Sequence, residues 1–267
     1  MINQLRIVVS GATGRMGRTL AGLIAAAPDL RLVGGIDRAG ARGEAEPGNP
    51  APPLAQPGAA AELLAMADAL LDFSAPVFTA ELLRREARAL AGRALVVGTT
   101  GLDEEVLSLL RSAAERSPVV VSANFSVGVN LLLGLVSEAA KRLPPDRYDV
   151  EILEAHHRHK ADAPSGTALA LGRAIAEARS AALDRLRRDG RSGRTGVRPA
   201  GEVGFHAIRG GDVVGEHRVL FLGPRERLEL AHQAEDRALF AEGALVAARW
   251  AARRPPGWYG MRDVLGL

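Results

Sequence analysis

Short apolar runs alternate with amphipathic stretches through the first half of the chain. An uninterrupted apolar run bounded by turn residues is typical of a strand that is buried on both faces of a parallel sheet. Such runs predict strands at 5–10, 31–36, 69–73, 94–98 and 118–123, and the amphipathic stretches predict helices near 15–27, 76–91 and 103–116. Repeated strand–helix–strand units indicate an α/β domain with a doubly wound parallel sheet.

The pattern changes after residue 127. A long predicted helix at 127–143 leads into RYDVEILEA, where apolar and polar residues alternate as in a strand with two different faces. Strands predicted at 202–208, 212–223 and 226–234 follow with short connections, as in an antiparallel meander. We therefore expect three parts: a first α/β domain (1–127), a second α+β domain built on a mixed sheet (128–235), and a C-terminal helix and tail (236–267) that return to the first domain.

Composition narrows the class of protein. Of 267 residues, 47% are hydrophobic and 24% are charged, as in soluble globular proteins, and no stretch approaches the ~18 uncharged apolar residues of a membrane span. The absence of cysteine excludes a disulfide scaffold, a thiolate zinc site and a cysteine nucleophile. The first residues contain no signal-peptide core, so we expect a cytoplasmic protein. The proline-rich segment 39–61 is expected to be an exposed loop.

Charge gives little support for a nucleic-acid partner. The formal net charge is only +3, and 4% of the residues are aromatic, whereas nucleic-acid binders need a basic surface with stacking side chains. We predict neither a nucleic-acid nor a membrane partner. All but two of the 34 basic residues are arginine, and the two lysines are Lys141 and Lys160.

A glycine-rich loop, SGATGRMGRTL, follows the first predicted strand and opens the first helix. Gly11, Gly14 and Gly17 stand where a dinucleotide-binding loop turns tightly and brings its backbone close to a phosphate at a helix N-terminus. The spacing on its own leaves open that the glycines only let the helix pack on the strand. Arg18 stands where a Walker loop needs lysine, which disfavours that type of phosphate site.

An acidic residue strengthens the dinucleotide interpretation. Asp37 ends the second predicted strand, where a carboxylate accepts hydrogen bonds from the adenosine ribose of NAD. The adjacent Arg38 can pair with the 2′-phosphate of NADP. Each can also be an ordinary turn charge, but together with the glycine loop they predict a Rossmann-like domain that binds NADH, NADPH or both.

Two later loops stand at the carboxyl ends of predicted parallel strands, the edge where such sheets bind ligands. They are Gly98-Thr99-Thr100-Gly101 and Ser122-Ala123-Asn124-Phe125. Both can line a nicotinamide ring. Plain turns are the alternative, with Asp103 as the cap of the next helix.

Candidate catalytic and binding residues are most concentrated in the segment EAHHRHKADAPSGTAL. Three of the six histidines of the chain fall there, at positions 156, 157 and 159. Their spacing differs from the i, i+4 pair of a helical zinc motif, so no metal is predicted. Imidazoles beside an amine at a strand end favour acid–base chemistry and carboxylate binding. Lys160 fits this chemistry because a lysine, unlike an arginine, can give up its proton.

The same segment continues into a predicted turn and helix. Ser165 is expected at the N-cap, with the first helical amides at Gly166 and Thr167. Those amides can hold a carboxylate of a small acidic substrate, although plain helix capping is the alternative.

These motifs resemble a known family. GATGRMGR, DFSAP, VVGTTG, ANFSVGVN, EAHHRHKADAPSGTAL, GFHAIRGGDVVGEH and the terminal MRDVLGL are together similar to the dihydrodipicolinate (4-hydroxy-tetrahydrodipicolinate) reductases of diaminopimelate and lysine biosynthesis. The resemblance runs from residue 5 to the end. It implies a dinucleotide domain interrupted by a mixed-sheet domain that assembles a homotetramer. The family often has glutamate at the position of Asp37, and its R-x-G-x-x-G-x-R loop is partly matched within 185–198, where we expect a solvated loop.

The resemblance also implies roles for individual residues. His156 and Lys160 would be the proton donors, and His157, Gly166 and Thr167 would bind the carboxylates of a small dicarboxylate substrate. The implied cofactor-binding residues are Gly11, Ala12, Thr13, Gly14, Arg15, Met16, Asp37, Arg38, Gly98, Thr99, Thr100, Ser122, Ala123, Asn124 and Phe125.

The function predicted from these residues is NAD(P)H-dependent reduction of 4-hydroxy-tetrahydrodipicolinate to tetrahydrodipicolinate with loss of water. Hydride would reach ring C4, and the proton would come from His156 and Lys160. Two alternatives remain. Another amino-acid dehydrogenase, such as an aspartate dehydrogenase, would share the glycine loop but would not need HHRHK followed by DAPSGT. A non-catalytic NAD sensor would bind NADH without turnover.

Overall fold

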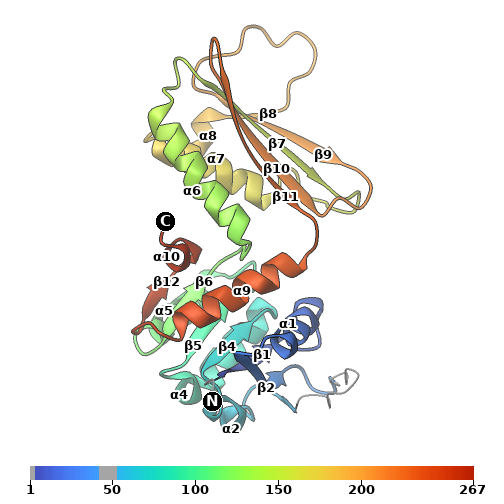
Figure 1. The fold of residues 1–267 in the computed structure, drawn as a ribbon, viewed down its shortest axis with the longest axis vertical. Helices are drawn as coiled ribbons and strands as arrows, with labels where there is room; N and C mark the ends of the chain where they lie inside the picture. The colour runs from blue at the N-terminus through green and yellow to red at the C-terminus, as the bar shows by residue number, and fades with distance from the viewer. Residues whose placement is uncertain (1–3, 42–52) are drawn as a thin grey trace. The chain divides into compact units, whose positions relative to one another are not determined.

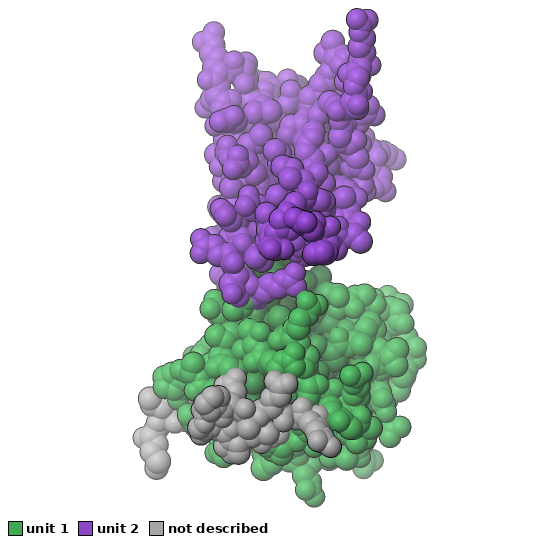
Figure 2. Space-filling view, turned by 90° about the vertical axis from the view of Figure 1, so that its right-hand side faces the viewer, with its two compact units in different colours: residues 1–126, 238–266 green, residues 127–237, 267 purple. Residues whose placement is uncertain are grey.

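The computed structural model describes residues 4–41 and 53–267 (Figure 1). The chain divides into two compact units, which Figure 2 shows in different colours. The first unit comprises Met1–Ser126 and Ala238–Gly266, and the second comprises Val127–Arg237 with Leu267. The first unit is thus closed by a segment that follows the second unit in the chain.

A seven-stranded sheet forms the centre of the first unit, in the order β12-β6-β5-β4-β1-β2-β3. Every neighbouring pair is parallel. The strands are β1 (Leu5–Ser10), β2 (Leu30–Ile36), β3 (Leu54–Ala55), β4 (Ala69–Asp72), β5 (Ala94–Val97), β6 (Pro118–Val121) and β12 (Gly257–Tyr259). The helices of this unit are α1 (Arg15–Ala26), α2 (Ala61–Ala65), α3 (Pro76–Arg85), α4 (Ala87–Leu90), α5 (Glu104–Ala114), α9 (Ala238–Ala251) and α10 (Met261–Leu265).

Helices cover both faces of this sheet, which explains why its strands are apolar throughout. Successive side chains point to opposite faces, so Ile7 and Val9 pack in one core with residues of α1, α9 and α10, while Val8 packs in a second core with residues of α2 to α5. The predicted doubly wound α/β domain is confirmed.

Two local predictions in this unit were wrong, and one strand was not predicted. The proline-rich segment was expected to be a loop, but Leu54 and Ala55 pair with β2 as the edge strand β3; residues 42–52 of that segment lie outside the described residues. The single helix expected at 76–91 is two helices, because the buried Glu86 leaves the helix and accepts hydrogen bonds from the amides of Gly58 and Ala60. The tail contains the short strand β12, which the sequence pattern did not show.

A five-stranded mixed sheet, in the order β11-β10-β7-β9-β8, forms the second unit. Its strands are β7 (Asp149–His156), β8 (Arg187–Asp189), β9 (Val203–Arg209), β10 (Gly215–Leu222) and β11 (Arg227–Ala234), and its helices are α6 (Val127–Arg142), α7 (Gly166–Ala178) and α8 (Leu183–Leu186). Helices α6 and α7 pack together, and residues of both share a core with one face of the sheet. The predicted mixed sheet is confirmed.

The predicted meander is correct only for β10 and β11, which form an antiparallel pair. Strand β9 pairs with β7 in parallel, and β10 pairs with the other edge of β7. The reason is that α7 lies between β7 and β9 in the chain, and a strand–helix–strand crossover places its two strands side by side in parallel. The turn at Gly210-Gly211 hydrogen-bonds to the backbone of His156 and Arg158 as it passes the end of β7.

The arginine-rich loop was expected to be solvated, and this expectation was wrong for two of its residues. Arg191 and Arg198, at the ends of the partly matched R-x-G-x-x-G-x-R segment, both donate to Glu151 on β7 at 2.9 to 3.0 Å. His206 also contacts Glu151, at 2.8 Å. A buried carboxylate needs charged or polar partners, and this loop supplies them.

A second buried carboxylate, Asp72, ends β4. It accepts hydrogen bonds from the hydroxyls of Ser10, Ser74, Thr79 and Thr99 at 2.5 to 3.2 Å. These residues come from β1, α3 and the loops after β4 and β5, so one side chain ties the carboxyl ends of three strands together. We expect Asp72→Ala to lower the free energy of unfolding by about 3 kcal/mol, because buried hydroxyls lose their acceptor.

Urea unfolding measures this loss. The matched control is Asp68→Ala, since Asp68 precedes the same strand but its ion pair with Arg6 is solvent-exposed. Exposed ion pairs contribute little to stability, so the control is expected to lose much less than Asp72→Ala. Equal losses in the two variants would contradict the structural role of Asp72.

Candidate functional site

The loop that joins β1 to α1 has no room for a side chain at its glycine positions. Gly11 has φ +75°, and a Cβ atom on Gly17 would lie 2.3 Å from the carbonyl oxygen of Gly11. Helix α1 begins after Gly14, and among the described residues no side chain caps it. Its first-turn amides therefore lie at an uncapped helix N-terminus, the geometry that binds a phosphate.

Asp37 lies beside this loop and is held by it. One carboxylate oxygen accepts hydrogen bonds from the backbone amide and the hydroxyl of Thr13, both at 2.8 Å, and the other accepts from the Arg38 amide at 2.8 Å. Burial acts to raise the pKa of Asp37, but the hydrogen bonds from Thr13 and Arg38 outweigh it and keep the pKa below its usual range. Asp37 is therefore an ionised acceptor at neutral pH.

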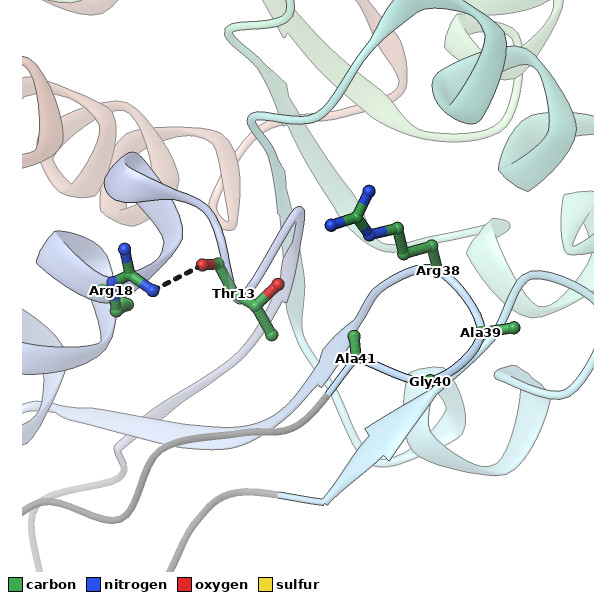
Figure 3. Close-up of a pocket in the computed structure, with 6 residues that line it drawn as sticks. All are labelled: Thr13, Arg18, Arg38, Ala39, Gly40 and Ala41. Atoms are coloured by element: carbon green, nitrogen blue, oxygen red, sulfur yellow. Dashed lines mark hydrogen bonds between the residues drawn. The ribbon is translucent and has the colours of Figure 1, made fainter.

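A pocket of about 530 Å³ opens next to Asp37 (Figure 3). In this view Arg18 and Arg38 stand on opposite sides of Thr13, and Arg18 donates to the Thr13 carbonyl at 2.9 Å. The residues that line the pocket are Thr13, Arg18, Arg38, Ala39, Gly40 and Ala41. Two guanidinium groups beside an uncapped helix N-terminus suit an anionic group.

The two later loops lie at the same edge of the sheet. The Gly98 amide donates to the Asp72 carbonyl, and the Ser122 amide donates to the Val97 carbonyl, so both loops begin directly at the carboxyl ends of β5 and β6. Asn124 accepts through Oδ1 from the Ser126 amide at 2.8 Å, which closes its turn. All fifteen predicted cofactor residues lie in the first unit, on the segments that follow β1, β2, β5 and β6 and in the first turn of α1.

The predicted catalytic residue His156 is the last residue of β7. Its Nδ1 lies 2.5 Å from Oε2 of Glu154, two residues earlier on the same strand face. Arg209, at the end of the adjacent β9, donates to both Glu154 oxygens at 2.7 Å. Burial is the largest influence on the pKa of His156, and together with the charges of Lys160 and Arg209 it keeps this pKa below its ordinary value despite the contacts with Glu154.

Lys160 and His157 lie in the turn that follows β7. The Lys160 amide donates to the His157 carbonyl at 3.1 Å, and Nζ lies 2.9 Å from Oδ1 of Asp162. Nε2 of His157 accepts from the guanidinium of Arg237 at 3.1 Å, since arginine can only donate. This places the proton of a neutral His157 on Nδ1, which is buried and has no hydrogen-bond partner within the described part of the chain.

The predicted helix cap at Ser165 is confirmed. Its hydroxyl accepts from the Ala168 amide at 3.2 Å and contacts Nε2 of the buried His217 at 3.0 Å. Gly166 begins α7 on the exposed side, and a Cβ atom there would meet nothing within 4 Å in the described structure. The open space before Gly166 and Thr167 allows a ligand to approach the helix N-terminus.

Sequence analysis missed three residues of this site: Glu154, Arg209 and His217. Glu154 was detectable in principle, because it precedes His156 by two positions and so shares its strand face. Arg209 and His217 come from β9 and β10, and only the observed strand order brings them to the end of β7.

Metal binding and membrane insertion find no support in the residues that the structure describes. Across 4–41 and 53–267, no three histidine, aspartate or glutamate side chains are grouped so that they could hold a metal ion. Within the same ranges no helix has both the length and the apolar character needed to cross a membrane.

Known proteins share both the sequence and the fold. The family models described as dihydrodipicolinate reductase N-terminus and C-terminus match residues 5–125 and 128–265. The 4-hydroxy-tetrahydrodipicolinate reductase of Parvibaculum lavamentivorans is 47% identical over 280 residues, covering 100% of each chain, and that of Thiobacillus denitrificans is 48% identical, covering 98% of this chain and 99% of its own. A dipicolinate-bound dihydrodipicolinate reductase from Paenisporosarcina sp. TG-14 has the same fold, with a TM-score of 0.76 at 23% identity over 97% of this chain and 99% of that one. The chain therefore belongs to the dihydrodipicolinate reductase family.

Proposed function

We propose that this chain catalyses the NAD(P)H-dependent reduction of 4-hydroxy-tetrahydrodipicolinate to tetrahydrodipicolinate, with loss of water, in diaminopimelate and lysine biosynthesis. Membership of the reductase family makes it an oxidoreductase. The observation that carries the substrate assignment is the segment 154–167, where an imidazole, an ammonium group and an open helix N-terminus lie within one strand end, turn and helix start.

The first unit fits NADH or NADPH. The uncapped N-terminus of α1 suits a pyrophosphate, and the ionised Asp37 suits ribose hydroxyls. When bound, the cofactor supplies the hydride for ring C4. The loops at Gly98–Thr100 and Ser122–Phe125, at the carboxyl ends of β5 and β6, would line the nicotinamide.

Cofactor preference depends on Asp37 and Arg38. We expect Arg38→Ala to raise the KM for NADPH about 10- to 100-fold and to leave the KM for NADH nearly unchanged, because only NADPH carries a phosphate that a guanidinium can bind. Asp37→Ala is expected to raise the KM for NADH, because it removes the acceptor of the ribose hydroxyls. It is expected to lower the KM for NADPH, because it removes a carboxylate that repels the 2′-phosphate. Steady-state rates with both cofactors measure these effects.

The control for this pair is Arg31→Ala, because Arg31 is exposed on β2, the strand that leads to Asp37 and Arg38, and does not line the pocket. It should leave both KM values as they are. If Arg38→Ala weakens NADH and NADPH equally, the assignment of Arg38 to the 2′-phosphate is wrong.

Substrate binding and proton transfer are assigned to the second unit. The amides of Gly166 and Thr167 and the side chain of His157 would hold the substrate carboxylates, which fixes the ring and makes the reaction effectively unimolecular. His156, assisted by the Lys160 ammonium, would deliver the proton that follows hydride transfer. The net result is addition of one hydride and one proton across the unsaturated imine that remains when water leaves.

The decisive experiment adds freshly generated 4-hydroxy-tetrahydrodipicolinate to the purified protein and follows NADH and NADPH absorbance. Rapid oxidation of either cofactor supports the reaction and the substrate together. No oxidation, with NADH binding intact, would favour a dehydrogenase of another amino acid or an NAD sensor. Oxidation of NADH or NADPH with the precursors of aspartate, and not with 4-hydroxy-tetrahydrodipicolinate, would indicate the dehydrogenase of another amino acid.

We also infer a cytoplasmic homotetramer. The sheet face opposite α6 and α7 carries Leu153 and Ile208, and Ile208 is 58% exposed. A second copy of this chain is the partner that suits such a face in a reductase of this family. Light scattering is expected to give about four times the 28.1 kDa of one chain, and a monomeric mass would contradict this part of the proposal.

A further inference from the structure

Glu154 is the most completely enclosed charged group near the proposed proton donor. Its side chain is 1% exposed, and four donor groups reach its two oxygens. Oε1 accepts from the Ser165 amide at 3.0 Å and from Arg209 at 2.7 Å, while Oε2 accepts from Arg209 at 2.7 Å and lies 2.5 Å from Nδ1 of His156. The partners of this carboxylate therefore come from β7 itself, from the N-cap of α7 and from β9.

We propose that Glu154 and Arg209 form a positioning pair that fixes the orientation of His156 and directs its Nε2 atom to the substrate. This inference rests on the proposed function, in which His156 takes part in proton transfer. Neither residue of the pair touches the substrate; both act through His156.

The direction of the hydrogen bonds gives the first argument. An ionised carboxylate only accepts hydrogen bonds, so Nδ1 of His156 must donate to Glu154. The neutral imidazole then carries its proton on Nδ1, and Nε2 is left as the atom that gains and loses a proton. Neighbouring Gly215 leaves room for this atom, since a Cβ atom there would lie 3.1 Å from Nε2.

Arg209 supplies the second argument, because it keeps Glu154 ionised. Burial acts to raise the pKa of Glu154, but the hydrogen bonds from Arg209, His156 and the Ser165 amide outweigh burial and keep this pKa below its ordinary value. The same guanidinium donates to the Asp162 carbonyl at 2.6 Å. Arg209 therefore anchors the turn that carries Lys160 as well as the carboxylate that holds His156.

The third argument is the shared anchor at Ser165. The Glu154 carboxylate binds the amide of the residue that caps α7, so the imidazole and the helix N-terminus that would hold the substrate are attached to one rigid group. Proton transfer needs the donor within hydrogen-bond distance of its target, and small misplacements are costly. Because both are attached to Glu154, the His156 imidazole and the N-terminus of α7 keep a fixed position relative to each other.

Four charged or titratable groups face His156, and they determine how its titration responds to substitution. Glu154 raises its pKa, while Lys160 and Arg209 lower it. The His217 ring lies edge-on at 5.2 Å, and burial lowers the pKa of His217 to about 4, so His217 stays neutral around pH 7. Loss of the Glu154 charge is therefore expected to move the His156 titration to lower pH.

The test combines nitrogen-15 NMR of the histidine side chains with steady-state kinetics on Glu154→Gln. In the unsubstituted protein His156 should show the neutral form protonated on Nδ1. In Glu154→Gln the side-chain amide can donate as well as accept, so a mixed or Nε2-protonated form should appear, with a lower titration midpoint. With substrate, kcat should fall on the order of 100-fold while the KM for NADH changes less than about twofold.

Two further variants keep the test decisive if Glu154→Gln is unstable because it leaves Arg209 buried without its partner. The double variant Glu154→Gln, Arg209→Gln removes both charges and should show the same change in His156. Glu151→Gln is the matched control, because it also removes a β7 carboxylate from two partly buried arginines, Arg191 and Arg198. It should leave the nitrogen-15 signals of His156 unchanged.

The proposal is overturned if His156 keeps its Nδ1-protonated form in both Glu154 variants, or if its form changes while kcat does not. The NMR measurement needs no substrate. If the unsubstituted protein fails to oxidise NADH with 4-hydroxy-tetrahydrodipicolinate, yet the Glu154 variants show the expected change in His156, the proposed function fails while the positioning role survives.

Discussion

Replacing Lys160 with methionine is expected to reduce kcat about 100- to 1,000-fold and to leave the affinity for NADH nearly unchanged. Methionine preserves most of the length and apolar surface of the side chain but has no proton to donate and no charge. The proposed cofactor residues lie in the first unit, whereas Lys160 lies in the second, in the turn after β7, so NADH binding is not expected to depend on its ammonium group. His156→Gln should produce a loss of the same order.

Lys141→Met is the matched control for this substitution. Lys141 is the chain's other lysine, and it is exposed on α6, where it pairs with Glu138. Its replacement should leave kcat and KM at their original values. Steady-state rates give kcat, and fluorescence titration with NADH gives the affinity. Equal loss of kcat and of NADH affinity in Lys160→Met would refute its role as a proton donor.

A pH profile separates the work of Lys160 from that of His156. Burial holds the pKa of His156 below its ordinary value, so its charged form is scarce at pH 7. If His156 alone donated the proton, kcat would already fall as pH rises through that lowered pKa. If Lys160 also donates a proton, the enzyme stays active to higher pH. In Lys160→Met, kcat is then expected to fall as His156 loses its proton.

The positions of the proposed cofactor residues in the fold were predictable because their signals are local in sequence. In a parallel sheet each strand delivers its following loop to the same edge, so a strand pattern and a few turn residues are enough to place Gly11, Asp37 and Gly98 together. The cap at Ser165 was equally local, since one hydroxyl and the next helical turn define it. These predictions needed no knowledge of long-range packing.

The substrate half was only partly predictable, because its supporting residues are distant in sequence. Glu154 on β7 accepts hydrogen bonds from Arg209 on the neighbouring strand β9. These strands are neighbours because α7 connects them in a parallel crossover, whereas the sequence pattern indicated a meander. Arg198 was predicted to be a solvated charge, but in the structure its guanidinium donates to Glu151. Periodicity identifies faces of a strand but not which strand lies alongside.

A substitution in the glycine loop is the second change for which we expect a large effect, here on cofactor binding. We expect Gly17→Val to weaken NADH and NADPH binding on the order of 100-fold. A Cβ atom at this position would lie 2.3 Å from the Gly11 carbonyl oxygen and 2.5 Å from that of Ala12. Both contacts are backbone atoms, so the loop itself must move and α1 must shift away from β1. Calorimetric titration with each cofactor measures the loss.

Gly260→Ala is the control, since Gly260 lies in the same unit and the nearest atom to its added Cβ would be 3.9 Å away. Gly17→Val should also lower the melting temperature, because overpacking against a rigid backbone is destabilising. The two effects are separable: a binding loss that greatly exceeds the loss of folded protein shows that the loop geometry serves the cofactor. If Gly17→Val is destabilised but its folded fraction binds NADH normally, the glycines serve only to pack α1 on the sheet, and the phosphate-binding role of this loop is wrong.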